Sequence, residues 1–416
     1  MNLIMIAKKY WIIIAVVVII AVLGFVFLPA IIGKIKQGGP ASPSQGGPSC
    51  SVAPGEWMPE RGECPGTTAE KRAQCEEFCE KHPDCCGERG DGEHVFGGRE
   101  IALPLPSDKE IAKLKRDYPT IIKVLNEGPN IYSRSGEASI IKDEELEEIK
   151  SIGFNTIQVL LIGKKENGKL VFNDFNNSVL LNDIAAIKKR GLAVWVALDI
   201  AGGPASQKTE LGDYSDFKSS FLDFTKKSAE LMEKYKVEYF TPNNEPDKPF
   251  KEQKNWSATE INSNLADFFP ATNAAAREKF KGKLINKITK TQNHAKEVLE
   301  ASFKNVDIVG VDVGPPMDGK MSLANYKQAF GEYQFFASLA KEKGLPWMNA
   351  EYWQGDFGQY SAFAKANEVK YAKISFDAYL KTAPKGVGYT WNDFTTFSLP
   401  QGEEMKKALA EFFKNI

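Results

Sequence analysis

From about residue 120 to the end of the chain, short apolar runs alternate with longer segments whose apolar positions recur every three or four residues. Short runs rich in β-branched and aromatic side chains predict strands, and the longer periodic segments predict helices. The predicted strands occupy residues 130–133, 156–162, 193–200, 283–288, 307–313 and 386–391, together with the two runs that lead to Glu245 and Glu351. The predicted helices occupy residues 143–151, 179–190, 214–235, 292–301, 325–343, 368–382 and 403–414.

This strand–helix alternation predicts a parallel α/β fold. Eight predicted strands between residues 130 and 416, in a region close to the roughly 250 residues typical of the fold, favour a (β/α)₈ (TIM) barrel. A doubly wound open sheet is the alternative, but it usually carries a glycine-rich phosphate loop, and neither G-x-G-x-x-G nor a P-loop occurs. Residues 247–282 are expected to form a long loop after the fourth strand.

The amino-terminal part has a different pattern. Residues 11–32 are almost continuously apolar and uncharged, and about 20 such residues span a bilayer as a helix. Residues 1–36 are therefore predicted to form a cytoplasmic tip and a transmembrane helix, with Lys8 and Lys9 placing the amino terminus in the cytoplasm. A cleaved signal peptide is the alternative, although its apolar region usually has only about 7–15 residues.

Two short regions separate this segment from the barrel. Residues 37–49 are rich in Gly, Pro and Ser, which predicts a flexible linker. All six cysteines follow within residues 50–98, and such a cluster predicts a disulfide-rich module in an oxidising, extracytoplasmic compartment. Residues 99–129 are expected to connect this module to the barrel, with a helix that a Ser107–Glu110 capping box opens and that runs to residue 117.

The charge balance and the histidine content limit the kinds of ligand that the protein is expected to bind. The chain has 53 basic and 54 acidic residues, for a formal net charge of -1, and this balance argues against nucleic acid, which favours a basic face. Only three histidines occur, so a histidine-rich metal site is not expected. We predict no metal and no cofactor.

Two glutamates stand where a barrel places its chemistry. Glu245 follows an alternating strand-like run that Pro246 ends, and Glu351 lies at the end of an apolar run among aromatic residues. The carboxyl ends of barrel strands carry catalytic groups. Glycoside hydrolysis needs two carboxyl groups, of which one must stay protonated near neutral pH; apolar surroundings and a like-charged neighbour favour that protonation.

With Asn244-Glu245-Pro246 after the fourth strand and Glu351 after the seventh, the region resembles the clan of retaining (β/α)₈ glycoside hydrolases that includes cellulases, mannanases and galactanases. The resemblance implies that Glu245 is the acid/base and Glu351 the nucleophile. It also implies that Asn244 hydrogen-bonds the sugar 2-hydroxyl and that Trp391 forms the floor of the −1 subsite.

Other residues at strand ends are candidates for substrate binding. They are Tyr352, Trp353, Asp199, Asn392 and Gln158, with Asp312 and Asp393 as further candidates. Gln158 stands where many clan members carry an arginine near the nucleophile, which is a departure from the family pattern. The aromatic residues of the fourth loop either contact a glycan or pack among themselves: Phe250, Trp256, Phe268 and Phe269.

These features predict a membrane-anchored, extracytoplasmic, retaining and endo-acting hydrolase of a β-linked polysaccharide. A catalytically degenerate surface barrel that binds glycans is the alternative. A structural cell-surface module without a sugar ligand is a third hypothesis, but it leaves the two glutamates unexplained.

Overall fold

The computed structural model describes residues 103–126, 141–166, 169–172, 174–199, 211–289, 294–313, 323–352, 362–392 and 402–416. The predicted transmembrane segment, the linker and the cysteine module all lie outside these residues, as do Trp353 and Asp393. Within the described part of the chain, no helix combines the length and apolarity needed to cross a membrane.

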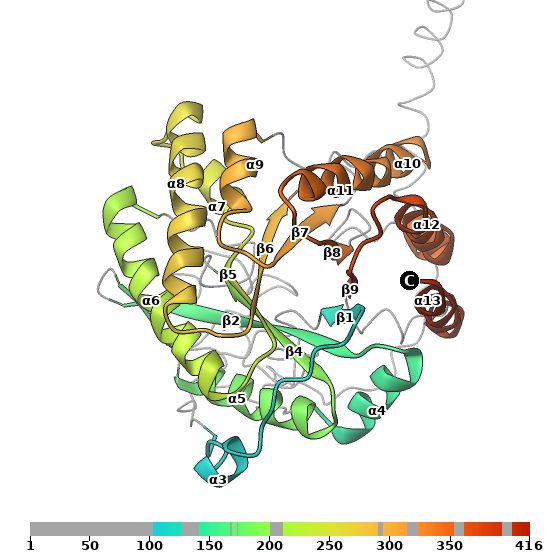
Figure 1. Ribbon diagram of the computed structural model, residues 1–416, viewed down its shortest axis with the longest axis horizontal. Helices are drawn as coiled ribbons and strands as arrows, with labels where there is room; N and C mark the ends of the chain where they lie inside the picture. The colour runs from blue at the N-terminus through green and yellow to red at the C-terminus, as the bar shows by residue number, and fades with distance from the viewer. Residues whose placement is uncertain are drawn as a thin grey trace, which may run out of the picture. The chain divides into compact units, whose positions relative to one another are not determined.

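Eight parallel strands close into a barrel (Figure 1). In chain order they are β1 (Ile122–Asn126), β2 (Thr156–Glu166), β4 (Ala193–Asp199), β5 (Tyr239–Asn244), β6 (Lys283–Thr289), β7 (Ile308–Val313), β8 (Trp347–Tyr352) and β9 (Gly388–Asn392). Each strand pairs with the next, and β1 pairs in parallel with both β2 and β9. The predicted (β/α)₈ barrel is confirmed, and the open doubly wound sheet is excluded because the ring closes. A short strand, β3 (Lys169–Phe172), extends β2 as an antiparallel hairpin.

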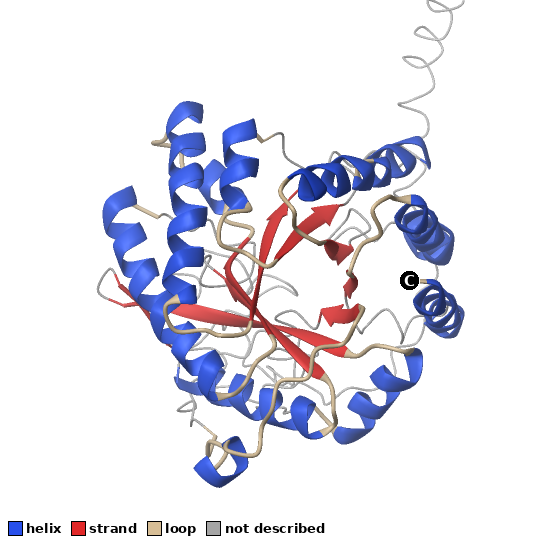
Figure 2. Cartoon of the chain, in the orientation of Figure 1, coloured by secondary structure: helices blue, strands red, loops and turns tan. Residues whose placement is uncertain are grey.

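Helices surround the strands, as Figure 2 shows in blue around red. The described helices are α3 (Asp108–Ile111), α4 (Asp143–Ile152), α5 (Asp174–Lys189), α6 (Tyr214–Lys234), α7 (Asp247–Lys251), α8 (Ala258–Arg277), α9 (Lys296–Ser302), α10 (Leu323–Gly331), α11 (Tyr333–Glu342), α12 (Ala362–Lys381) and α13 (Gly402–Asn415). Their apolar faces pack inward; α6, for example, buries Phe221, Phe224 and Met232 at helical spacing.

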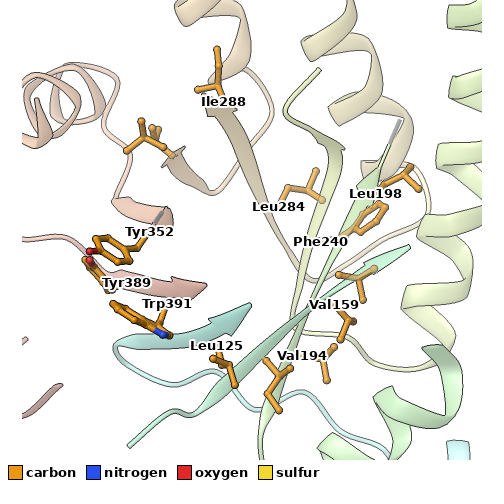
Figure 3. Close-up of a cluster of buried hydrophobic side chains, with 14 of the residues drawn as sticks. Leu125, Val159, Val194, Leu198, Phe240, Leu284, Ile288, Tyr352, Tyr389 and Trp391 are labelled. Atoms are coloured by element: carbon orange, nitrogen blue, oxygen red, sulfur yellow. The ribbon is translucent and has the colours of Figure 1, made fainter. Parts of the chain in front are cut away.

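The apolar core has two layers because side chains alternate along each strand. Outward-facing side chains pack against the helices, among them Leu125, Val194, Phe240 and Leu284 (Figure 3). Inward-facing side chains fill the barrel, including Trp195, Tyr239, Ile285, Ile308 and Met348. Full burial of one such side chain contributes about 1.5–3 kcal/mol, so both layers stabilise the ring on which the site is built.

The first strand of the barrel was predicted incorrectly. It was expected at residues 130–133, which lie outside the described residues, whereas β1 is Ile122–Asn126 and closes the ring. The barrel therefore begins before residue 130. The helix expected to reach residue 117 is also shorter: the Ser107–Glu110 capping box is present, but α3 ends at Ile111.

The long loop expected at residues 247–282 is wrong as well. This region contains α7 and the 20-residue α8, the outer helix that follows β5. Pro270 lies inside α8 and made the sequence look non-helical. A signal was nevertheless present, because Ser257 and Glu260 form the same capping box that identifies α3.

Candidate active site

Glu245 and Glu351 lie at the carboxyl end of the barrel, as predicted. Glu245 directly follows β5, and Glu351 is the last residue but one of β8. Glu245 has a φ of 46°, a left-handed conformation uncommon for a residue with a side chain. Its backbone N–H donates to the carbonyl of Lys287 at 3.2 Å, and this bond holds the unusual turn against β6. Strain of this kind clusters at functional sites.

The barrel interior changes character along its strands. On β7 the inward positions run from Ile308 through Gly310 to Asp312, and on β6 they run from Ile285 to Lys287. The apolar layer is therefore closed at the amino end, and charged groups gather at the carboxyl end. Irregularities in the pairing of β5, β7 and β8 accompany this change, consistent with the way bulges re-aim side chains next to active sites.

Three carboxyl groups converge at this end. One carboxyl oxygen from each of Glu245, Asp312 and Glu351 lies within 4.8 Å of the others, and all three residues are buried. Retaining glycosidases place two carboxyl groups about 5–5.5 Å apart, so the spacing of the two glutamates suits covalent rather than water-separated chemistry. Asp312, which the sequence left as a secondary candidate, stands between the strands that carry them.

Both oxygens of Glu351 have donors. Lys287 on β6 hydrogen-bonds one oxygen and forms an ion pair with it. Asn392 at the end of β9 donates to the other oxygen at 2.6 Å, and Asn126 on β1 in turn donates to the Asn392 side-chain oxygen at 3.1 Å. Asn392 was predicted to bind sugar hydroxyls; here its amide positions the Glu351 carboxylate.

Glu245 has its own cation. The Lys248 ammonium, one turn along in α7, lies 2.7 Å from its carboxylate, and the Lys248 side chain is 42% exposed. Asp247 fixes α7 to the end of β6, because its buried carboxylate accepts a hydrogen bond from the Thr289 hydroxyl at 2.8 Å. Burial, followed by the negative charge of Glu245, raises the pKa of Asp247 to about 6.

The protonation of the site differs from the expectation. Burial acts to raise the pKa of Glu245, but the positive charges of Lys248 and Lys287 outweigh it and hold that pKa well below its usual range. Asp312 shows the reverse: burial, then the charges of Glu351 and Glu245, raise its pKa well above the usual range. Of the two groups, the raised pKa therefore belongs to Asp312 and the lowered pKa to Glu245.

Three other predicted residues lie near these groups. Asp199, at the end of β4, pairs in register with Asn244 at the end of β5, so both lie at the end of the barrel that carries Glu245. Gln158 on β2 is in register with Asn126 and faces the interior. Both polar atoms of the Gln158 side chain are buried without a hydrogen-bond partner among the described residues. A positive charge near Glu351 comes instead from Lys287 on β6.

Two predicted aromatic contacts are placed elsewhere. Tyr352 and Trp391 stack on each other with ring centroids 4.7 Å apart and an interplanar angle of 17°, and each is 1% exposed. They face the helices, Tyr352 packing on Phe330 of α10 and Trp391 on Phe376 of α12. Figure 3 shows Tyr352 and Trp391 in the cluster of buried hydrophobic side chains. Both rings therefore lie in the outer core, because strand alternation turns them away from Glu351 and Asn392.

The aromatic residues between β5 and β6 also pack in the core. Phe250, Phe268 and Phe269 are fully buried. Trp256 is partly buried and lies edge-on to Phe250, with ring centroids 5.3 Å apart. Of the two alternatives left open by the sequence, packing holds for these residues.

The three clustered carboxyl groups could offer oxygen ligands to a cation. However, each glutamate already has an ammonium partner, Lys287 or Lys248.

Sequence reasoning missed Lys287, Lys248 and Asn126. A signal for Lys287 existed, since a lysine two positions from Ile285 on one face of a buried strand must have a buried partner. Which partner it has depends on the closure of the barrel, and that is not visible in a local pattern.

Comparisons with known proteins give the architecture. No family model and no curated protein matches the sequence. Similar solved structures include a GH5-4 broad specificity endoglucanase from an uncultured bacterium (13% identity, TM-score 0.54, 77% of this chain and 100% of that chain). They also include a family 5 xyloglucanase from Paenibacillus pabuli (12%, 0.52, 71% and 99%) and an exo-β-1,4-mannosidase from Opitutaceae bacterium strain TAV5 (14%, 0.54, 75% and 62%). At these identities the likeness is one of fold, and these structural neighbours are clan A glycoside hydrolases.

Proposed function

We propose that this chain is a retaining glycoside hydrolase that acts on a β-linked glycan. The observation that carries the proposal is the convergence of the Glu245 and Glu351 carboxyl groups within 4.8 Å at the carboxyl end of the barrel. The fold supports it, because similar structures are named as an endoglucanase, a xyloglucanase and a β-mannosidase.

In the proposed first step, Glu351 attacks the anomeric carbon and forms a covalent glycosyl-enzyme. Lys287 and Asn392 hold the Glu351 carboxylate in place, so little reorganisation is needed before attack. A proton reaches the glycosidic oxygen through Glu245 as the bond to the leaving group breaks. In the second step Glu245 accepts a proton from the water that releases the sugar.

Substrate positioning is assigned to polar groups around the two glutamates. Asn244 is proposed to hydrogen-bond the sugar 2-hydroxyl, and Asp199 and Gln158 are proposed to bind further hydroxyl groups. The Gln158 amide supports this role, because its unpartnered buried polar atoms face the barrel interior.

A screen of β-glucan, xyloglucan, mannan and galactan, read for new reducing ends, tests the proposal. We expect one glycan to be hydrolysed, and we expect Glu351→Gln and Glu245→Gln each to lower kcat by about 10³-fold or more, since removing the central catalytic group of other hydrolases costs more than this. Glu252→Gln, an exposed glutamate just after α7, is the matched control and should retain full activity. Unchanged turnover by Glu351→Gln would refute the assignment.

A catalytically degenerate glycan-binding barrel is the second candidate. It is favoured by one observation, the Lys248–Glu245 ion pair, which opposes protonation of the proposed acid. Saturable binding of a glycan in calorimetry, without release of reducing ends, would support this alternative over the hydrolase.

We also propose that the barrel is tethered outside a membrane by residues 1–36. The uncharged apolar run of residues 11–32 and the cysteine cluster of residues 50–98 support this placement. Protease treatment of intact cells should remove the barrel while an amino-terminal tag stays protected. A barrel that resists protease until the cells are lysed would contradict it.

A further inference from the structure

Of the three clustered carboxyl groups, only that of Asp312 forms no ion pair with a lysine, arginine or histidine among the described residues. It lies on β7 and is fully buried between β6, which carries Lys287, and β8, which carries Glu351. Neither of its oxygens accepts a hydrogen bond from an N–H or hydroxyl donor within the described ranges. In the described part of the chain, the carboxyl of Glu245 is the one group that approaches it as a hydrogen-bond partner.

Two carboxylates cannot hydrogen-bond each other unless one carries a proton, and a buried carboxylate without a donor is costly. The charge count leads to the same conclusion. Three carboxyl groups, those of Glu245, Asp312 and Glu351, face two ammonium groups, those of Lys248 and Lys287. One proton makes the cluster neutral and supplies the missing donor.

We propose that Asp312 is a positioning residue that stores the proton which Glu245 delivers to the leaving group. This inference rests on the proposed hydrolase function and deepens it. In the resting site Asp312 is a neutral acid whose hydroxyl donates to the ionised Glu245. Asp312 never touches the sugar, because it acts through Glu245.

Burial and the neighbouring charges support this placement of the proton. Burial comes first, and the negative charges of Glu351 and Glu245 then raise the pKa of Asp312, while Lys248 lowers it. The other titratable groups around it are Lys287 on β6 and Tyr333 on α11, and Tyr333 is a neutral phenol whose pKa burial raises further.

Loss of the Lys248–Glu245 ion pair starts the proton transfer from Asp312 to Glu245. Lys248 is half-exposed, so a sugar that reaches Glu245 displaces it and removes a positive charge that keeps Glu245 ionised. The Asp312 O–H bond then breaks and a Glu245 O–H bond forms. The same proton passes to the glycosidic oxygen as that oxygen takes the electron pair of its bond to the anomeric carbon. In the second step, the proton lost by water returns through Glu245 to Asp312, and the starting charges are restored.

The first test does not depend on the substrate. Infrared difference spectra of the full chain at about pH 8 compare the wild type with Asp312→Asn, which keeps the shape of a neutral acid. We expect the carbonyl band of a neutral carboxylic acid in the wild type and its loss in Asp312→Asn. Asp183→Asn is the matched control: burial raises the pKa of Asp183 only to about 7, so this substitution should leave the band intact.

Glu245→Gln provides a second variant in which the Asp312 side chain is retained. The amide removes one negative charge, so the Asp312 and Glu351 carboxylates then balance the two ammonium groups, and the same band should weaken or shift. A neutral-acid band at about pH 8 that is identical in the wild type, Asp312→Asn and Glu245→Gln would overturn the inference, whatever the glycan screen shows.

The second test uses aryl β-glycosides of the sugar that the screen selects. With a phenyl leaving group, which needs protonation, Asp312→Asn should lower kcat/KM by about 10²–10⁴-fold, the usual contribution of a general acid. With 2,4-dinitrophenyl, which leaves without a proton, the loss in the first step should be less than about 10-fold. An equal loss on both substrates would indicate a merely structural role and overturn the inference. Absence of hydrolysis by the wild type would count against the hydrolase alone, since the infrared comparison judges the stored proton independently.

Discussion

Lys287 on β6 reaches past β7 to Glu351 on β8 and donates a hydrogen bond to its carboxylate. The lysine is buried, and its pKa is raised because the charges of Glu351 and Glu245 outweigh the effect of burial, which acts in the opposite direction. The proposed nucleophile is thus held by a cation from a strand that the sequence did not associate with it.

Lys287→Met tests this ion pair. It leaves the Glu351 carboxylate buried with the Asn392 amide as a donor but without its ammonium partner, and breaking one side of a buried ion pair costs about 3–5 kcal/mol. We expect urea unfolding at neutral pH to show a loss of that size. Adding Glu351→Gln removes the stranded charge, so the double variant should recover most of the loss. Strictly additive effects of the two substitutions would contradict the pairing.

Lys248 sets the pH dependence of the proposed acid. Its positive charge lowers the pKa of Glu245 and that of Asp312, so Lys248→Met should raise both. A general acid with a higher pKa keeps its proton to higher pH, and the alkaline limb of the kcat/KM profile should therefore move to higher pH. Lys248→Arg retains the charge and should leave the limb in place. A limb that does not move in Lys248→Met would contradict the role of Lys248.

Glu238 carries a separate ion pair at the amino end of the barrel. It lies 2.5 Å from Lys188 and accepts backbone hydrogen bonds from Asp117 at 2.9 Å and Val194 at 2.8 Å. Glu238→Gln strands the buried lysine and should lower the unfolding free energy by about 3–5 kcal/mol, with kcat unchanged because the site is at the other end.

The control for Glu238 is Glu147, whose ion pair with Arg190 at 3.1 Å is largely exposed. Glu147→Gln should cost no more than about 1 kcal/mol, as exposed pairs do. If both substitutions lowered the unfolding free energy equally, burial would not be the reason that the Glu238–Lys188 ion pair stabilises the fold.

Asp183 predicts a pH-dependent stability. Burial raises its pKa to about 7, against the hydrogen bond that it accepts from the Ile141 backbone. The folded state therefore keeps a proton that the unfolded state releases above a pKa of about 3.9, and stability falls as pH rises from about 4 to about 7. The Asp183→Asn side chain does not titrate, so this variant lacks the pH-dependent contribution of Asp183 to stability. Denaturant unfolding should show its stability relative to the wild type rising by about 4 kcal/mol across that window; a constant difference would contradict the raised pKa.

The positions of Glu245 and Glu351 were predictable because each ends a locally recognisable strand, and parallel strands in a closed barrel share one end. The orientation of the Tyr352 and Trp391 side chains was not predictable. Tyr352 and Trp391 are also at strand ends, but the side to which each points depends on strand alternation and on the irregular pairing of β8 with β9, which no local pattern reveals.

The protonation of the site was also beyond the sequence. Apolar and like-charged surroundings were expected to raise the pKa of Glu245, yet the positive charges of Lys248 and Lys287 lower it, and the raised pKa belongs to Asp312. A pKa depends on which charges lie within a few ångströms. Glu245 follows β5, whereas Lys287 lies on β6 and Asp312 on β7, and helices separate these strands along the chain. The three side chains come together only when the strands lie side by side in the barrel.

The central claim, that Glu351 becomes bonded to the sugar, is tested most directly by covalent trapping. The full chain is incubated with 2,4-dinitrophenyl 2-deoxy-2-fluoro β-glucoside, β-mannoside and β-galactoside, whose fluorine slows release of the glycosyl-enzyme, and peptide mass spectrometry then locates the adduct. We expect one of these sugars to be attached to Glu351 and no adduct in Glu351→Gln. An adduct on another residue, or hydrolysis of the natural glycan with no adduct from any of the three, would contradict it.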